Sequence, residues 1–367
     1  MTGGGGVIRL AGRILVDERT ERGEAWVIGG RVTFERPRFS GDATTIEGVI
    51  LPGLVDVHCH VGVTVGGAAD EALAEKQAEA DRDTGVLLIR DAGSAIDTAW
   101  VHDRPDLPRL IRAGRFIARP KRYLRGYARE LDRVEDLPSA AAEEARRGDG
   151  WVKIIADWID RDVGDLRPLW PDDVLADAIA AAHAAGARVT AHTFATEAAR
   201  GLLDAGIDCI EHGTGLNPEH IAEAARGGIP VVPTLLQVGQ FASIADQGRA
   251  KFPEFSARMQ AMYQARYAQV RRFHEAGVPL LVGTDAGGTI GHGSLAQECA
   301  EMVAAGVPAA DVVAAATWVA RRFLGAPGIE EGASADLVAF ADDPREDIRA
   351  LAEPTAILLR GANVLSV

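Results

Sequence analysis

His58 and His60 are the first residues in the chain whose type and spacing could do chemistry. They close a mostly apolar run with the sequence LPGLVDVHCH. Alternate side chains of a β-strand point to the same side, so the two imidazoles would share one face. A pair of imidazoles at the end of a buried strand is suited to bind a metal ion such as Zn²⁺. The alternative is a pair of histidines held by hydrogen bonds in a turn, and residues further along the chain must decide.

Four polar residues stand at the ends of, or within, later apolar runs. Taken alone, a histidine or an aspartate at such a place has an ordinary explanation, as a satisfied core residue or a helix cap. Lys153 is harder to explain, because an ammonium group within the apolar run WVKII is costly unless it is paired or neutralised. The joint pattern therefore favours a functional site. The four residues are Lys153, His192, His212 and Asp285.

Short apolar segments alternate with alanine-rich helical segments from residue 50 onward, which predicts parallel βα units. Eight such units in about 270 residues fit a (β/α)8 TIM barrel, and a doubly wound open sheet is the rival. In such barrels the active site lies at the carboxyl ends of the strands, where the polar residues above occur. His292 follows the eighth strand, and its role stays open. The predicted strands are 50–58, 86–90, 115–119, 151–156, 187–192, 208–211, 229–233 and 279–284.

The two ends of the chain have a different pattern from the middle. Residues 7–50 form a series of short β-strand patterns, and short strand patterns return at 335–341 and 356–365. We therefore expect a small composite β-sandwich built from residues 1–50 plus 333–367. The barrel, residues 51–332, would be inserted between its two halves.

The composition excludes several classes of partner. The chain has 53 acidic and 39 basic residues and a net charge of −14, which argues against a nucleic-acid partner. No apolar run reaches the roughly 18 residues that would span a membrane. Three scattered cysteines do not form a disulfide framework. With no signal peptide recognisable at the N-terminus, these features predict a protein of the reducing cytoplasm.

The motifs together resemble the metal-dependent amidohydrolase superfamily, nearly from end to end. The similarity is greatest to the branch with imidazolonepropionase-like and prolidase-like peptidases. It implies a (β/α)8 barrel, a small-molecule substrate and a family in which homo-oligomers are common. It rests on LPGLVDVHCH at 51–60, GVLLIRDAG at 85–93, AHT at 191–193, IEHG at 210–213, GTDAG at 283–287 and GASADLVAF at 332–340.

The resemblance also implies a role for each polar residue of the pattern. Two divalent ions would be bound, with Zn²⁺ expected and Mn²⁺ or Fe²⁺ as alternatives. Asp285 would be both a ligand and the catalytic base. The implied ligands are His58, His60 and Asp285 for the more buried ion, His192 and His212 for the second, and Lys153, carboxylated by carbon dioxide, as a bridge between both.

This ligand set favours hydrolysis of an amide-type C–N bond in a peptide, an N-acyl amino acid or a cyclic amide. A lactonase or ester hydrolase, or an organophosphate hydrolase, could use the same ions. A mononuclear deaminase is a further alternative, but deaminases of this barrel usually lack the lysine of the fourth strand, so Lys153 argues against it. A scaffold protein without activity should have lost ligands, and all six are present.

The chain departs from its relatives after the third strand, where related peptidases often have Gly-Gly-His. Residues 119–133 form a strongly basic loop there, with Arg125-Gly126-Tyr127 at the matching place. Tyr127, with Arg125 or Arg122, is therefore a candidate contact to a substrate carbonyl or carboxylate. Solvated loop side chains explain the pattern equally well. A second long loop, residues 235–254, is predicted to be a lid.

Overall fold

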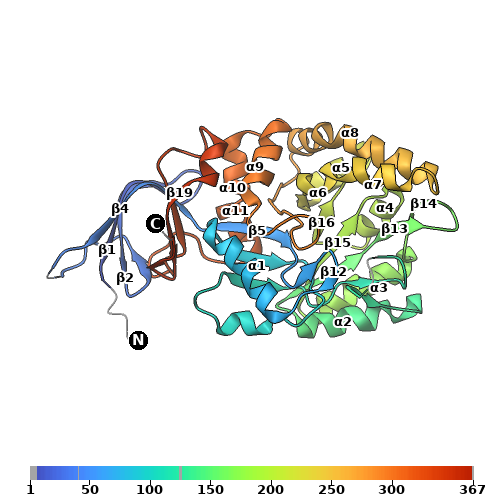
Figure 1. Ribbon diagram of the computed structural model, residues 1–367, viewed down its shortest axis with the longest axis horizontal. Coiled ribbons are helices and arrows are strands. Elements are labelled where there is room, and N and C mark those ends of the chain that lie inside the picture. The colour runs from blue at the N-terminus through green and yellow to red at the C-terminus, as the bar shows by residue number, and fades with distance from the viewer. Residues whose placement is uncertain (1–5, 40, 124–125, 366–367) are drawn as a thin grey trace.

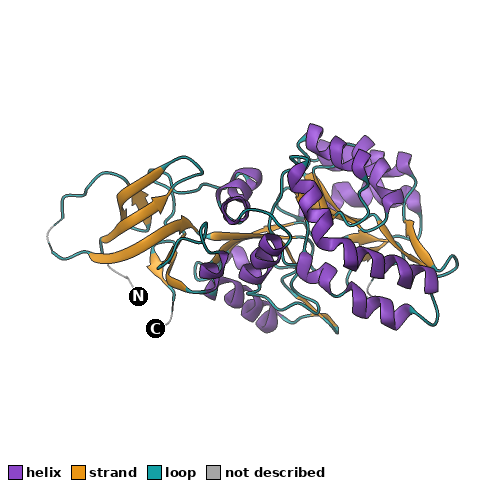
Figure 2. Cartoon of the chain, turned by 90° about the horizontal axis from the view of Figure 1, so that it is seen from above, coloured by secondary structure: helices purple, strands orange, loops and turns teal. Residues whose placement is uncertain are grey.

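The computed structural model describes residues 6–39, 41–123 and 126–365. Figure 1 shows a β-sheet at one end of the molecule, formed by both ends of the chain, beside a larger body of mixed strands and helices. The view from above in Figure 2 places most of the helices around the strands of this body. The mixed α/β content that we predicted is present, with short parallel strands followed by helices.

The terminal sheet has seven strands in the order β20-β19-β18-β4-β1-β2-β3. Strand β18 pairs antiparallel with β4, so that Val338 lies opposite Leu51. Inward side chains from both ends of the chain, including Leu10 and Leu358, form one apolar cluster. The strands are β1 (Ile8–Leu15), β2 (Glu21–Ile28), β3 (Arg31–Thr33), β4 (Thr44–Pro52), β18 (Leu337–Phe340), β19 (Pro354–Leu359) and β20 (Ala362–Asn363).

The strands of the larger body pair in parallel, in the orders β5-β8-β9 and β11-β10-β12-β15-β16-β17. Two short antiparallel hairpins, β6-β7 and β13-β14, stand apart from these sheets. The strands are β5 (Leu54–Cys59), β6 (Val63–Thr64), β7 (Gly67–Ala68), β8 (Val86–Asp91), β9 (Arg109–Arg112), β10 (Ile117–Ala118), β11 (Arg129–Glu130), β12 (Trp151–Ile155), β13 (Asp157–Asp160), β14 (Asp165–Pro168), β15 (Arg188–Thr193), β16 (Cys209–His212) and β17 (Val231–Val232).

The eighth predicted strand, 279–284, is not a regular strand, although it lies between β17 and β5. Its backbone hydrogen bonds are divided between the two neighbours: Leu281 donates to Val231, and Val57 donates to Val282. The segment therefore forms isolated β-bridges, at Leu280 and Ala286, in place of a continuous ladder of paired residues. The third predicted strand, 115–119, is shorter than expected, because only β10 lies within it. Strand β10 pairs with β12, whereas the strand that pairs with β8 is β9, which precedes the predicted range.

Helices follow most of the parallel strands. The prediction of a loop at 235–254 was wrong over most of its length, because the chain there forms α6 and α7. Leu235, Val238, Phe241 and Ala245 are buried at helical spacing and explain this. The helices are α1 (Glu71–Asp83), α2 (Leu137–Arg147), α3 (Asp172–Ala184), α4 (Thr196–Asp204), α5 (Pro218–Gly227), α6 (Leu235–Gly239), α7 (Phe241–Gly248), α8 (Pro253–Glu275), α9 (Leu295–Ala304), α10 (Ala309–Ala315) and α11 (Trp318–Leu324), with 3-10 turns at Ala99–Asp103, Val134–Asp136 and Ile348–Ala352.

A search of the described ranges for a helix with the length and hydrophobicity needed to cross a membrane found none.

Gly283 permits the close approach of the 280–286 segment to β5. A Cβ atom at this position would lie 2.6 Å from the Cβ of His58 and 2.7 Å from Cγ1 of Val232. We predict that Gly283→Ala lowers the free energy of unfolding by about 1–3 kcal/mol, because overpacking forces the backbone to move. Denaturant unfolding measures it. Gly291→Ala is the control, since an added Cβ there meets nothing within 4 Å; equal effects of both changes would contradict the prediction.

Candidate metal centre

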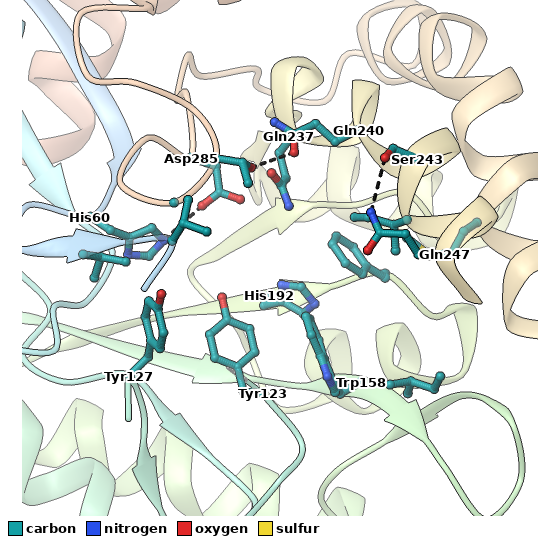
Figure 3. Close-up of a pocket in the computed structure, with 18 of the residues that line it drawn as sticks. His60, Tyr123, Tyr127, Trp158, His192, Gln237, Gln240, Ser243, Gln247 and Asp285 are labelled. Atoms are coloured by element: carbon teal, nitrogen blue, oxygen red, sulfur yellow. Dashed lines mark hydrogen bonds and ion pairs between the residues drawn. The ribbon is translucent and has the colours of Figure 1, made fainter. Parts of the chain in front are cut away.

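The six polar residues singled out in the sequence converge at the carboxyl ends of neighbouring parallel strands. The Asp285 Oδ1 atom lies 3.3 Å from Nε2 of His58 and 3.0 Å from Nε2 of His60. The Lys153 Nζ atom, from β12, lies 3.3 Å from Nε2 of His58. Figure 3 shows His60 and Asp285 at one end of a cavity. One cluster therefore joins β5, β12 and the segment after residue 284.

The remaining two histidines belong to the same cluster. His192 at β15 and His212 at β16 lie with Nδ1 and Nε2 3.0 Å apart. The rings of His58 and His212 have centroids 5.2 Å apart, which connects this pair with the residues of β5. The structure thus brings together all six side chains that the sequence pattern selected.

The donor atoms of this cluster fit divalent metal ions. His58, His212 and Asp285 offer ligand atoms that lie within 4.8 Å of one another. The Nε2 atom of His192 is buried and has no hydrogen-bond partner among the described residues. A buried polar atom without a partner is costly, and a metal ion would satisfy it. Imidazole nitrogen and carboxylate oxygen are donors that Zn²⁺, Mn²⁺ and Fe²⁺ accept.

Lys153 and Asp285 are electrostatically opposite members of the cluster. Burial lowers the pKa of the Lys153 ammonium, which favours the neutral amine. Burial opposes ionisation of Asp285 as well, but the neighbouring His58 charge and the hydrogen bonds from His58 and His60 outweigh it. The pKa of the Asp285 carboxyl is consequently held well below its usual value, and the group is a carboxylate at neutral pH.

A buried ion pair between Arg90 and Glu211, which the sequence did not reveal, contacts the His58 ring at its Nδ1 atom. The Glu211 Oε2 atom lies 2.7 Å from His58 Nδ1, and Oε1 lies 2.5 Å from Nη2 of Arg90. All three side chains are almost fully buried. A carboxylate beside Nδ1 favours a proton there and leaves Nε2 of His58 free to bind a metal ion. The signal in the sequence was the Glu beside His212, but its partners lie on other strands.

Asp56 connects β5 with the 280–286 segment. Its Oδ1 atom accepts hydrogen bonds from the backbone N–H groups of His58, at 3.0 Å, and of Thr284, at 3.2 Å. Its Oδ2 atom accepts the Thr284 hydroxyl at 2.6 Å. Burial, followed by the charge of Asp81, raises the pKa of Asp56 to about 7. These bonds fix Asp285, the residue after Thr284, beside the histidines.

His292, whose role the sequence left open, has a structural place in the loop after residue 285. Its Nδ1 atom lies 2.7 Å from Oδ2 of Asp81 on α1, and the other oxygen of Asp81 accepts the Gly293 N–H at 2.7 Å. The thiol of Cys59 lies near this pair. Asp81 thus attaches the loop that carries Asp285 to α1.

The basic loop gives a mixed outcome for the predicted substrate contacts. Tyr127 lines the cavity, but its hydroxyl donates to the backbone carbonyl of Thr64. The Arg122 guanidinium lies 2.9 Å from Asp160 Oδ1 and also donates to the carbonyl of Ile159, so the structure does not bring it into the cavity. Arg125 lies outside the described residues. Tyr123 and Trp158, which the sequence reasoning missed, line the cavity near His192 instead.

Comparison with known proteins places the chain in a family. The model of the amidohydrolase family matches residues 49–364. An uncharacterized protein of Mycobacterium tuberculosis is 52% identical over 340 residues, which cover 92% of this chain and 91% of the relative. Ochratoxinase of Aspergillus niger is 26% identical over 234 residues, covering 62% of this chain and 48% of that protein. A Xaa-Pro dipeptidase structure with bound methionine has a TM-score of 0.82 at 22% identity, over 98% of this chain and all of that one.

The chain belongs to the amidohydrolase family, and it is a hydrolase with prolidase-like structural neighbours. The resemblance stated from the motifs is confirmed. Enzymes of this family act on small molecules and generally use metal ions, and the cluster above offers the ligand groups for them.

The Arg90–Glu211 pair makes a testable contribution to stability. We predict that Glu211→Gln lowers the free energy of unfolding by about 3–5 kcal/mol, because it leaves the buried Arg90 charge uncompensated. Denaturant unfolding of metal-free protein measures this. Glu223→Gln is the matched control, because its partner Arg200 is exposed and solvent screens that pair. A loss no larger than that of the control would show that the buried pair is dispensable.

Proposed function

We propose that the protein is a binuclear metal-dependent hydrolase that cleaves an amide-type C–N bond. The observation that carries the proposal is the convergence of four histidines, one lysine and one aspartate at adjoining strand ends. In this proposal the parallel strands form a (β/α)8 barrel, residues 51–332, and the terminal sheet belongs to a composite β-sandwich, residues 1–50 plus 333–367.

Two divalent metal ions would occupy the cluster, and Zn²⁺ is the metal that we expect. The short contacts of His58 and His60 with Asp285 support these three residues as ligands of the more buried ion. The adjacent His192 and His212 would hold the second ion. When bound, the ions would supply Lewis acidity toward the substrate carbonyl and lower the pKa of a coordinated water molecule.

Lys153 would bridge the two ions as a carbamate. The side chain is 2% exposed, and burial lowers its pKa, which favours the neutral amine that reacts with CO₂. Its nitrogen would form a bond with the carbon of CO₂ and release one proton. This reaction replaces a buried neutral amine by an anion with two oxygen ligands, which suits a site where imidazoles are the neighbours.

Asp285 would transfer the proton during catalysis. Its carboxylate lies at the border between the cluster and the cavity and is partly exposed, at 14%. It is ionised at neutral pH and can accept the proton of the attacking water. The same oxygen can then deliver the proton to the leaving nitrogen, which makes the amine a better leaving group.

The substrate class of the site can be tested by mass spectrometry. Zinc-loaded protein is incubated with pools of N-acyl amino acids, dipeptides, cyclic amides, lactones, phosphotriesters and aminated heterocycles. We predict addition of water across an amide, with loss of activity in chelator and recovery with Zn²⁺. Exchange of an amino group for oxygen would instead identify a deaminase. Cleavage confined to lactones or phosphotriesters would favour those hydrolase activities.

The bridging role of Lys153 predicts a change in metal content. Lys153→Ala should bind fewer than two ions per chain, because the shared ligand is lost. Elemental analysis after dialysis measures the ratio, with Lys76→Ala, an exposed position on α1, as control. An unchanged ratio in Lys153→Ala would refute the bridging carbamate.

The proton-transfer role of Asp285 predicts a loss of turnover. Asp285→Asn should reduce kcat by about 10²- to 10⁴-fold, because the amide cannot accept the proton. Steady-state kinetics on the amide found in the screen measure this, and metal content is determined for the same sample. Asp347→Asn is the control, because Asp347 is half-exposed at the start of the 3-10 turn Ile348–Ala352 and is not one of the proposed ligands. Turnover at the rate of the unmodified protein would exclude the role.

A further inference from the structure

The cavity beside the proposed metal centre has two chemically different sides. Its volume is about 500 Å³, within the range of sites for drug-sized molecules. One side, here called the aromatic wall, consists of Phe116, Tyr123, Trp158 and Phe194. The other, here called the glutamine ledge, consists of Gln237 from α6, Gln240 between the two helices, and Ser243 and Gln247 from α7.

The rings of the aromatic wall pack on one another and on the histidines of the centre. The centroid of Tyr123 lies 5.2 Å from that of Phe116 and 4.8 Å from that of Trp158. Trp158 lies 5.4 Å from the His192 ring, and Phe194 lies 4.0 Å from it. A substrate whose cleaved bond lies beside His192 must therefore place the group next to that bond against these rings. Aromatic pairs at such spacings are favourable beyond the area that they bury.

The aromatic wall is held in position by the β13-β14 hairpin, which carries Trp158. Arg258 on α8 binds Asp165 of this hairpin at 2.6 Å and Glu197 of α4 at 2.9 Å. The backbone of Phe255 also donates to the carbonyl of Gly164 in the hairpin turn. The wall is thus formed before a ligand arrives, and little ordering is required of it on binding.

The glutamine ledge offers hydrogen bonds without charge. The Thr289 hydroxyl donates to Oε1 of Gln240 at 2.6 Å, and Nε2 of Gln247 donates to the Ser243 hydroxyl at 3.3 Å. Figure 3 shows these side chains across the cavity from Tyr123 and Trp158. Primary amides both donate and accept, so they match a neutral polar group such as a carbonyl, an amide or a hydroxyl.

The described lining of the cavity offers no cationic side chain to an anionic substrate. None of these residues is a lysine or an arginine. Arg122, which we had predicted as a carboxylate contact, is paired with Asp160. A carboxylate placed on the ledge would lose its hydration without gaining a charged partner there.

We infer that the substrate is an uncharged aryl amide, with an aromatic ring on the wall and an uncharged group facing the ledge. This inference rests on the proposed amide hydrolysis and adds the class of substrate. Trp158 contributes to selecting the ring, because it lies in the wall between the Tyr123 ring and the His192 ring.

Three matched amides test this inference on the zinc-loaded full chain. Benzanilide is neutral with two rings, 4-(benzoylamino)benzoate adds one carboxylate, and N-methylacetamide has no ring. We expect kcat/KM for benzanilide to exceed those for the other two by at least about tenfold. Trp158→Leu should lower kcat/KM for benzanilide about tenfold, chiefly through KM, and Trp158→Phe should restore most of it. Phe39→Leu, in the loop after β3, is the control and should change nothing.

The outcomes separate this inference from the proposed function. Preference for the carboxylated or the ring-free amide, or an unchanged KM in Trp158→Leu, would overturn the aryl-amide class and leave amide hydrolysis intact. If no amide is cleaved, hydrolysis itself fails, and calorimetric titration with benzanilide decides the cavity's preference. Binding that Trp158→Leu weakens about tenfold would support the class, whereas no binding, or equal binding by both proteins, would overturn it.

Discussion

The buried Arg90–Glu211 ion pair, with the His58 imidazole against it, is the interaction on which the rest of the centre depends. Three strands, β8, β16 and β5, each contribute one member, so the ion pair fixes these strands to one another beneath the cluster. Arg90 also donates to the carbonyl of Val57 and lies over the Trp151 ring, at 4.5 Å from its centroid. A fully buried guanidinium would be untenable without these contacts. The same contacts orient the His58 imidazole toward Asp285.

The sequence predicted the parts of the fold that depend on local pattern. Apolar segments bounded by polar strand ends indicated β8, β12, β15 and β16 to within one residue, because a strand buried on both faces is apolar throughout. The first predicted strand, 50–58, began too early, because its first residues belong to β4 and β5 begins at Leu54. The pattern could not show that the 280–286 segment divides its hydrogen bonds between two neighbours. It also could not separate a loop from two short helices at 235–248, where the burial of Leu235 and Phe241 depends on tertiary contacts.

The proposed ligands were predictable, whereas most of their supports were not. Each proposed ligand stands at the end of an apolar run or, in the case of Lys153, within one, so its type and position are both visible in the chain. Glu211 is adjacent to His212, yet its partner Arg90 is far away in sequence and meets it only when β8 and β16 face the same interior. The basic loop misled the prediction for a related reason. Positive charge on Arg122 suggested a substrate carboxylate, but Asp160, on a hairpin that the sequence did not indicate, neutralises it.

Backbone strain at the rim of the centre shows why its residues cannot be chosen from side-chain chemistry alone. His212, Thr234 and Asp285 all have positive φ, of 66°, 46° and 58°, although none is glycine. Such conformations cost on the order of 1–3 kcal/mol each and persist when the surroundings impose them. Here the Asp285 N–H donates to the carbonyl of His58 at 2.7 Å, and Thr234 Oγ1 lies 2.7 Å from His212 Nδ1. These bonds turn the side chains toward one cluster, so the backbone framework itself positions the proposed ligands.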